Sequence, residues 1–344
     1  MVGVANRASL RRGWVIRGNM RGQWRLSVGC TTPPDAERPY VRPNADIVDQ
    51  QRFLIRLLMR VSLVGVRMSL VHMSRGVPLA LCLLSPISCA QAQQVLYDHP
   101  DAARVTVRSE MVGDPGLTVD LYYPPMAGDE PNPVVVFVLG YPDDAPPIPP
   151  MKDHGQYTSW ARLVAAEGFV GVLYETSDPQ ADLATVLTFL SEKAASLRID
   201  PGRIGLWSCS ANTPVALKRA RTRVGVTPAA FVAYYGLMPT PDGYQAAAID
   251  SSSTRFGFSL PGYRDGESYR ADLPMLVVRA GRDRFSEILN SIDHFTAFAF
   301  QENLAVTVLN YPEGQHAFDV EDDTKETHAI IKQTLDFFRA HLGG

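Results

Sequence analysis

The stretch that most constrains the fold of this chain is residues 203–217, which read Arg-Ile-Gly-Leu-Trp-Ser-Cys-Ser-Ala-Asn-Thr-Pro-Val-Ala-Leu. Residues 204–207 are apolar and predict a short buried strand, and the residues after the turn predict a helix. Small residues fill the turn, as is needed where a strand and a helix pass close together. A small-x-nucleophile-x-small turn between strand and helix is a nucleophile elbow, which lifts the middle side chain above the sheet edge.

The turn over residues 208–212, Ser-Cys-Ser-Ala-Asn, makes Ser210 the predicted nucleophile. A serine hydroxyl is a weak nucleophile at neutral pH, so this residue needs a base and an acid elsewhere in the chain. The backbone N–H of Ala211 would lie near a helix N-terminus, where it can stabilise an oxyanion. We therefore expect Ala211 to supply one donor of an oxyanion hole.

Two other interpretations of the turn remain open. If the frame is shifted back by one residue, Cys209 becomes the nucleophile, but Trp207 then occupies a position that requires a small residue. Alternatively, the small residues merely fill a tight turn. Asn212 favours this interpretation, because glycine is usual at its position. A base and an acid at suitable positions elsewhere in the chain would favour the frame in which Ser210 is the nucleophile.

Charge divides the chain into two parts. Residues 1–92 hold 13 Lys/Arg and 4 Asp/Glu, whereas residues 93–344 hold 20 and 32. An acidic body argues against a nucleic-acid partner, which would favour a basic face. The arginines of residues 1–72 interrupt the one apolar stretch there, so we expect no stable membrane span. We interpret residues 1–72 as a basic leader that is disordered or results from a misplaced start codon.

Residues 73–92 have the features of a secretory signal. Arg75 gives a basic start, an apolar run follows over residues 77–84, and Ala90-Gln-Ala92 forms a cleavage site. We expect cleavage after Ala92 and a periplasmic or secreted protein, or a cytoplasmic one if the internal signal is not used. A lipoprotein signal through Cys89 is less well supported by the sequence.

Cysteine usage and motifs exclude several kinds of site. Three of the four cysteines, Cys30, Cys82 and Cys89, precede residue 93, so after cleavage Cys209 alone remains and cannot form an intrachain disulfide. The sequence contains no CxxC, HExxH, P-loop or GxGxxG motif. We therefore expect no metal and no cofactor.

From residue 93 onward, predicted strands alternate with predicted helices, which indicates one α/β domain over residues 93–344. The strands before residue 124 alternate like an antiparallel edge pair, whereas the later ones are continuous apolar runs typical of a parallel sheet. Residues 237–272 are expected to be irregular and too short for a large lid. The expected strands are 105–108, 117–123, 134–139, 169–174, 204–207, 229–235, 273–280 and 304–309; the expected helices are 157–167, 180–197, 215–223, 286–300 and 324–342.

The carboxyl ends of two late strands provide the missing partners of the serine. Asp283 follows the strand at 273–280, and His316 follows the strand at 304–309. Functional residues of doubly wound sheets gather at this edge, and the order Ser210, Asp283, His316 is that of a hydrolase triad. His316 would take the serine proton, and Asp283 would orient the imidazole. Asp319 is a rival acid, but it lies close to His316 and far from a strand end.

The loop after the strand at 134–139 completes the predicted site. Tyr141 is the expected second oxyanion donor, because Gly140 permits a tight backbone turn before it. His154 lies in the same Pro-rich loop. We expect it to line the site at most.

These residues resemble the dienelactone hydrolase family of the α/β-hydrolase superfamily. The resemblance rests on the elbow, on Ala-Gly-Arg-Asp at 280–283 and on Gly-Gln-His-Ala-Phe at 314–318. It implies an α/β-hydrolase fold and cofactor-free hydrolysis of acyl compounds, with the triad on Ser210, Asp283 and His316. Members that open dienelactones use cysteine where this chain has Ser210, which favours a general carboxylesterase.

The sequence thus predicts a serine hydrolase that cleaves carboxylic esters or lactones through an acyl-enzyme. Its expected partner is a small-molecule ester or lactone. A thioesterase or peptidase on the same triad, and a non-catalytic binding module on the same fold, remain as alternatives, because a fold alone does not decide function.

Overall fold

The computed structural model of the chain describes residues 93–343, except 114–115, 127, 129, 141–149, 257–258 and 263–267. The predicted leader and signal segment lie outside these residues. Within the described part, no helix is both long enough and apolar enough to cross a membrane.

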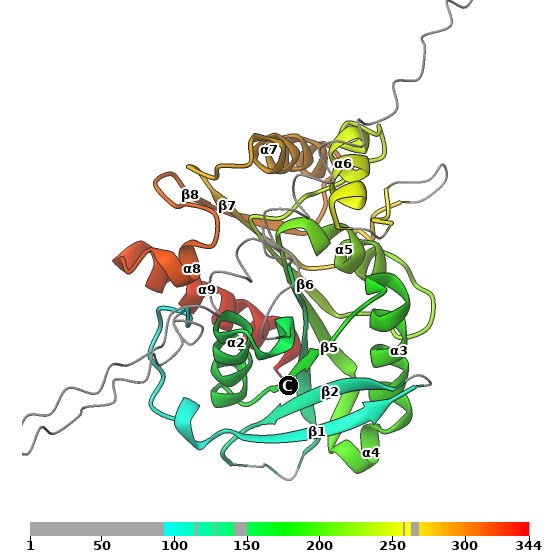
Figure 1. Cartoon of the computed structure of the whole chain (residues 1–344), viewed down its shortest axis with the longest axis vertical. Helices are drawn as coiled ribbons and strands as arrows, with labels where there is room; N and C mark the ends of the chain where they lie inside the picture. Colours follow the sequence, from blue (N-terminus) through cyan, green and yellow to red (C-terminus); the bar gives the residue numbers. More distant parts are fainter. Residues whose placement is uncertain are drawn as a thin grey trace, which may run out of the picture. The chain divides into compact units, whose positions relative to one another are not determined.

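An eight-stranded sheet forms the centre of the described region (Figure 1). Its strand order is β1-β2-β4-β3-β5-β6-β7-β8, with antiparallel β1–β2 and β2–β4 pairs and parallel pairs from β4 to β8. This confirms the expected mostly parallel sheet with antiparallel N-terminal edge strands. The strands are β1 (Thr106–Val112), β2 (Leu117–Tyr123), β3 (Asn132–Val138), β4 (Val170–Tyr174), β5 (Ile199–Cys209), β6 (Ala230–Tyr234), β7 (Met275–Ala280) and β8 (Val306–Tyr311).

The central strand β3 shows why the apolar runs form a buried sheet. Val134, Val136 and Val138 pack into the core on one face, whereas Val135 and Phe137 pack into the core on the other. Successive side chains of a strand point to opposite faces, so a strand covered on both sides is apolar at every position.

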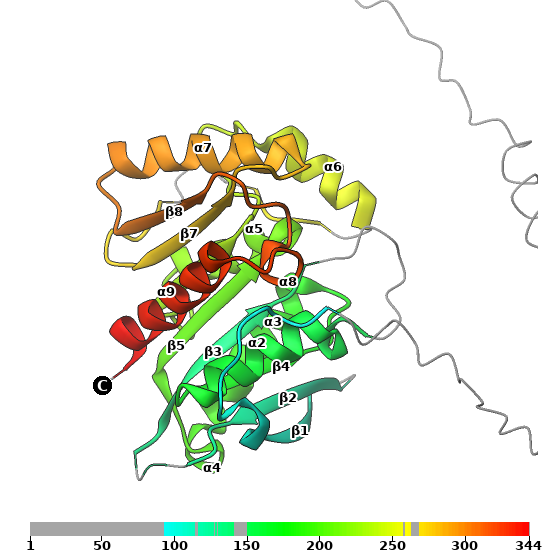
Figure 2. The same ribbon diagram turned by 90° about the vertical axis from the view of Figure 1, so that its left-hand side faces the viewer.

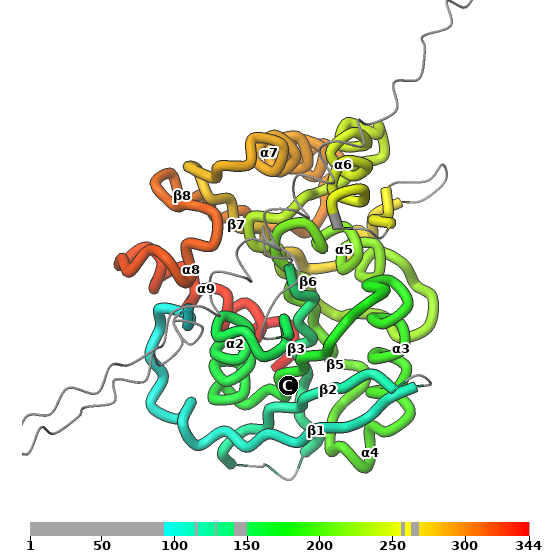
Figure 3. Tube along the Cα trace, in the orientation of Figure 1, coloured from blue at the N-terminus to red at the C-terminus, as the bar shows by residue number. Residues whose placement is uncertain are grey.

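Helices cover both faces of the sheet. The longer ones are α2 (Gly155–Ala166), α3 (Pro179–Glu192), α5 (Thr213–Arg221), α7 (Ser286–Gln301) and α9 (Lys325–Leu342). The buried residues of α3, α5 and α7 belong to one core, and those of α2 and α9 belong to the other. Figure 2 shows α2 and α9 in front of the sheet, and Figure 3 follows the chain from the cyan N-terminal strands to the red C-terminal helix. No large lid domain is present among the described residues.

Two predicted elements differ from the structure. The helix expected over 180–197 is divided into α3 and α4 (Ala194–Leu197), after which Arg198 is left-handed with φ 53°. The Arg198 carbonyl accepts hydrogen bonds from the backbone and side chain of Asn132, so contact with β3 determines this turn. The segment expected to be irregular at 237–272 contains α6 (Ala246–Phe256).

Helix α6 was not predicted because its sequence consists mostly of small and polar residues. Ile249 is the single buried residue among its described side chains, and the periodicity that identifies an amphipathic helix is therefore missing. A further short helix, α8 (Phe318–Glu321), follows the predicted histidine.

Candidate active site

Ser210 lies at the turn between β5 and helix α5, in a short 3-10 turn, η4 (Ser210–Asn212). Its φ is 55°, in the left-handed region that non-glycine residues rarely adopt. Such backbone strain costs roughly 1–3 kcal/mol and persists where the surrounding structure holds it. The local geometry is therefore that of the strained turn expected from the sequence.

His316 joins Ser210 to Asp283. Its Nε2 lies 3.1 Å from the Ser210 Oγ, and its Nδ1 lies 2.7 Å from the Asp283 Oδ2. The other Asp283 oxygen accepts the backbone N–H of Phe285 at 2.9 Å. His316 and Asp283 are 8% and 7% exposed. With Nδ1–H donated to a shielded carboxylate, Nε2 carries the lone pair that can accept the serine proton.

Two glycines let the loops that carry Asp283 and His316 meet. The Gly281 N–H donates to the Tyr311 carbonyl at 2.7 Å, and the Arg282 N–H donates to the Gly314 carbonyl at 2.8 Å. A Cβ on Gly281 would lie 2.4 Å from the Pro312 carbonyl oxygen, and one on Gly314 would lie 2.3 Å from the Tyr311 ring. The two loops are therefore held together by backbone bonds that leave no room for a side chain.

Cys209 is placed away from this chemistry. Its side chain is buried at 2% exposure, and its Sγ lies 3.5 Å from the Tyr157 hydroxyl. Burial raises the pKa of the Cys209 thiol to about 12. Because the thiolate is the reactive form of cysteine, this thiol is a poor nucleophile near neutral pH. The frame centred on Ser210 is the one that brings a nucleophile to a histidine.

The fold of this chain is similar to that of solved esterase and hydrolase structures. No protein-family model and no curated protein sequence matches the chain. Solved structures do match: a bacterial heroin esterase aligns over 72% of this chain and 87% of its own, with 17% identity and a TM-score of 0.54. Esterase LipW from Mycobacterium marinum aligns over 70% and 82%, with 16% identity and a TM-score of 0.54. MGS-M1, an alpha/beta hydrolase enzyme from a deep-sea metagenome library, aligns over 69% and 98%, with 15% identity and a TM-score of 0.51.

The chain has the α/β-hydrolase fold. At these identities the likeness concerns the fold alone, so the chemistry has to be argued from the residues at the carboxyl edge of the sheet. The three residues predicted from the sequence do meet at that edge of this α/β-hydrolase fold.

The region expected to form the oxyanion hole is described in part. Ala211 lies directly after Ser210 in η4, and Tyr141 falls outside the described residues. The peptide group that joins Leu139 to Gly140 is fixed at both ends: the Leu139 carbonyl accepts from Asn212 Nδ2 at 2.7 Å, and the Gly140 N–H donates to the Tyr157 hydroxyl at 3.0 Å. Asn212 thus ties the elbow to the end of β3, a contact that glycine could not make.

Asp319, the rival acid, bonds to other groups than the histidine. It is fully buried, and its oxygens accept from the Tyr235 hydroxyl at 2.7 Å, Trp160 Nε1 at 2.8 Å and Gln156 Nε2 at 3.0 Å. Sequence reasoning found Asp319 but missed these three donors. The sequence gives little indication that these three residues bond Asp319, because a tyrosine at a strand end and polar residues in a helix are common.

His154 lies at the N-terminus of α2, half-buried, with its ring centroid 6.1 Å from that of Tyr157. Burial lowers the pKa of His154 below its usual value, so the neutral form is favoured. Its Nδ1 is buried, and no hydrogen-bond partner for it occurs among the described residues. Among the residues that the structure describes, no hydrogen bond joins His154 to Ser210, His316 or Asp283.

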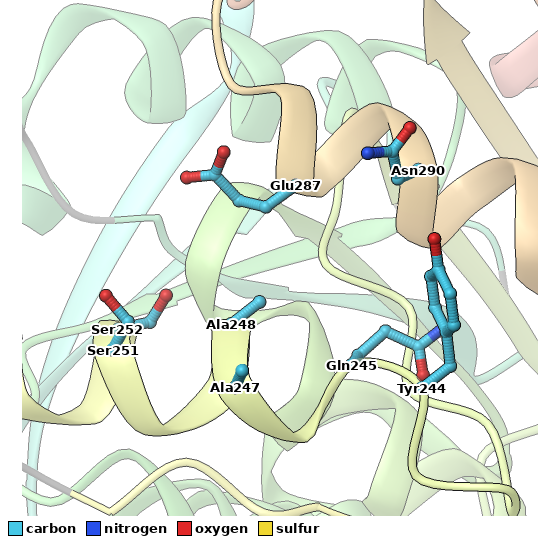
Figure 4. A pocket seen from close by; sticks show the side chains of 8 residues that line it. All are labelled: Tyr244, Gln245, Ala247, Ala248, Ser251, Ser252, Glu287 and Asn290. Atoms are coloured by element: carbon cyan, nitrogen blue, oxygen red, sulfur yellow. The ribbon is translucent and has the colours of Figure 1, made fainter. Parts of the chain in front are cut away.

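A cavity of about 380 Å³ lies between α6 and α7 (Figure 4). Glu287 and Asn290 belong to α7, and the alanines and serines of the lining belong to α6. The lining residues are Tyr244, Gln245, Ala247, Ala248, Ser251, Ser252, Glu287 and Asn290. None of them is a member of the Ser210–His316–Asp283 set, so this cavity is distinct from the candidate reaction centre. In the part of the chain that the structure describes, no cluster of three or more His, Cys, Asp or Glu side chains could hold a metal ion.

Proposed function

We propose that this protein is a serine hydrolase that cleaves carboxylic esters or lactones through an acyl-enzyme. The observation that carries the proposal is the bridge made by His316, 3.1 Å from the Ser210 Oγ and 2.7 Å from Asp283. A base within hydrogen-bond reach of a nucleophile, itself oriented by an acid, is the arrangement that activates serine.

The proposed reaction has two halves. As the Ser210 Oγ attacks the acyl carbon, His316 Nε2 accepts the hydroxyl proton, and the imidazolium is stabilised by Asp283. The tetrahedral intermediate collapses, the leaving alkoxide takes the proton from His316, and an ester between the acyl group and Ser210 remains. Water then attacks this ester while His316 accepts its proton, which returns to Ser210 as the carboxylic acid leaves.

The resemblance to dienelactone hydrolases extends the proposal to the substrate. Serine in place of cysteine favours ordinary carboxylic esters over dienelactones. Because no large lid is present among the described residues, we propose small or medium acyl groups. Activity restricted to emulsified long-chain lipids would contradict this.

A fluorophosphonate probe tests the activated serine. The probe phosphonylates serines that an adjacent base has activated, so peptide mass spectrometry of the labelled full chain should find the adduct on the peptide with Ser210. His316→Ala should abolish the adduct, and Ser210→Ala serves as the matched blank. An unlabelled wild type would exclude an activated serine and favour a binding module on the same fold.

A substrate panel separates the acyl chemistries. We expect p-nitrophenyl acetate and butyrate to be hydrolysed faster than matched thioesters or aminoacyl amides. Faster turnover of thioesters or of amides would assign the triad to a thioesterase or a peptidase.

We also propose export, with cleavage after Ala92. Backbone groups two and three residues after Gln93 are bonded to the domain: the Val95 N–H donates to the Ser159 Oγ at 2.9 Å, and the Leu96 N–H donates to the Asp319 carbonyl at 2.8 Å. N-terminal sequencing of the protein from its native host should give Gln93 first. A protein that begins before residue 73 would contradict the proposal.

A further inference from the structure

The imidazole of His316 packs against two aromatic rings. The Tyr235 ring centroid is 4.6 Å away at an interplanar angle of 55°, and the Phe285 centroid is 4.8 Å away at 81°. Phe285 is already tied to the triad, since its N–H bonds Asp283. Tyr235 makes no bond to a triad residue among the described contacts, so its presence against the imidazole needs another explanation.

Tyr235 is held from several sides. It follows β6 directly, with φ 35°, a left-handed conformation that is unusual for an aromatic residue. Its N–H donates to the Val278 carbonyl at 2.8 Å, and its hydroxyl accepts from Gln156 Nε2 at 2.9 Å and donates to Asp319 Oδ1 at 2.7 Å. Burial raises the pKa of Tyr235 well above its usual value, so the phenol stays protonated and remains a donor.

Asp319 connects this tyrosine to two other parts of the molecule. It lies three residues after His316, in α8, and its second oxygen accepts from Trp160 and Gln156 of α2. A fully buried carboxylate is costly to desolvate, and here neutral donors surround it. The short segment that carries His316 is thereby anchored to α2 and to the end of β6.

We propose that Tyr235 and Asp319 are positioning residues that fix the plane of the His316 imidazole. Asp319 accepts a hydrogen bond from the Tyr235 hydroxyl, and the Tyr235 ring packs against the imidazole, which Phe285 also contacts. With the ring plane fixed, Nε2 stays on Ser210 while Nδ1 stays on Asp283. This inference rests on the proposed function, because it assigns a role in the same triad.

Loss of the Tyr235 hydroxyl should loosen the imidazole without removing its packing. Misplacement of a catalytic group by about 1 Å can lower a rate roughly a hundredfold. We therefore expect Tyr235→Phe to lower kcat about ten- to a hundredfold on p-nitrophenyl acetate, with KM changed by about twofold or less.

Tyr234→Phe is the matched control. Tyr234 is also fully buried, and its hydroxyl also makes a short bond, 2.6 Å to the Thr334 Oγ1. Its ring packs against Trp160, Trp207, Phe318 and the Tyr235 ring, and in the described part of the chain it makes no ring contact or hydrogen bond with His316. A purely structural role for buried tyrosine hydroxyls would affect both variants alike. We expect similar losses of thermal stability in the two but a loss of kcat in Tyr235→Phe alone.

A spectroscopic readout that needs no turnover completes the test. The proton on His316 Nδ1, bonded to Asp283, should give a downfield proton NMR resonance in the full chain. We expect Tyr235→Phe to shift or broaden it and Tyr234→Phe to leave it unchanged. If Tyr235→Phe does not fold, Asp319→Asn, which keeps the size of the side chain, is measured in its place.

An unchanged resonance in the folded variant overturns the proposal, as does a fall in kcat no larger than that of Tyr234→Phe. Failure of the proposed function is distinguishable from both. If the proposed function is wrong, fluorophosphonate would leave the wild-type protein unlabelled. The NMR resonance of the His316 Nδ1 proton would still show whether Tyr235 holds the imidazole.

Discussion

Asp283 and Asp319 are both buried carboxylates near the same histidine, yet their partners differ. Asp283 bonds the imidazole of His316, whose charge changes during the proposed reaction. Asp319 bonds the side chains of Tyr235, Gln156 and Trp160, whose charges do not change. The carboxylate nearer in sequence to His316 is thus not the one that bonds its imidazole.

This difference teaches that burial alone does not identify a catalytic acid. A carboxylate paired with a titrating group contributes when the proton moves, whereas one bonded to neutral donors contributes to the stability of the ground state. Substitution of Asp283 should therefore lower activity with little loss of stability, whereas substitution of Asp319 should lower stability and, through the imidazole it positions, activity to a smaller degree.

The largest effect is expected at Asp283. Asp283→Asn keeps the size of the side chain but favours the wrong imidazole tautomer, and kcat should fall about 10⁴-fold. The stability to urea should change little. The control is Asp323→Asn, which alters an exposed pair with His328, 2.9 Å apart, and should leave kcat unchanged. Retention of more than a tenth of the wild-type kcat in Asp283→Asn would exclude Asp283 as the orienting acid.

Asp319→Ala should lower stability more than Asp283→Asn does, and should lower kcat less. Removal of the carboxylate leaves the buried donors on Tyr235, Trp160 and Gln156 without their acceptor, so the free energy of unfolding should fall by about 3–5 kcal/mol. Urea unfolding followed by tryptophan fluorescence measures this loss. A stability equal to that of Asp283→Asn would abolish the distinction between the two carboxylates.

Gly281→Ala tests how the loops bearing Asp283 and His316 are held together. The added methyl would lie 2.4 Å from the Pro312 carbonyl oxygen, so the loops must separate, at a cost of about 1–3 kcal/mol and with a lower kcat. Gly128→Ala is the control, since nothing lies within 4 Å of its Cβ position. Equal activity and stability in the two variants would show that the close approach of the loops is not needed.

The smallest effect is expected at Cys209. With a thiol pKa of about 12, the reactive thiolate is scarce at pH 8 and increases only as the pH approaches 12. Iodoacetamide should therefore modify Cys209 in urea but not in the native protein at pH 8, and activity should survive the native treatment. Mass spectrometry reports the modification. Rapid native alkylation with loss of activity would instead support the frame in which Cys209 is the nucleophile.

The sequence predicted most elements because their signals are local. Val134 to Val138 alternate between two cores, and the apolar stripe of α9 includes Ile330, Leu335 and Phe338. It missed α6, whose described side chains leave only Ile249 buried, and the break at Lys193, the residue that lies between α3 and α4.

The sequence by itself determined which residues could form a triad, because the elbow and the strand ends are visible as local patterns. Only the tertiary structure decided how they are held. The distances that join His316 to Ser210 and to Asp283 depend on the register of the parallel strands. They also depend on the close contacts of Gly281 and Gly314. The bracing of His316 by Tyr235 and Asp319 joins residues far apart in the chain, and no local pattern encodes a contact of that kind.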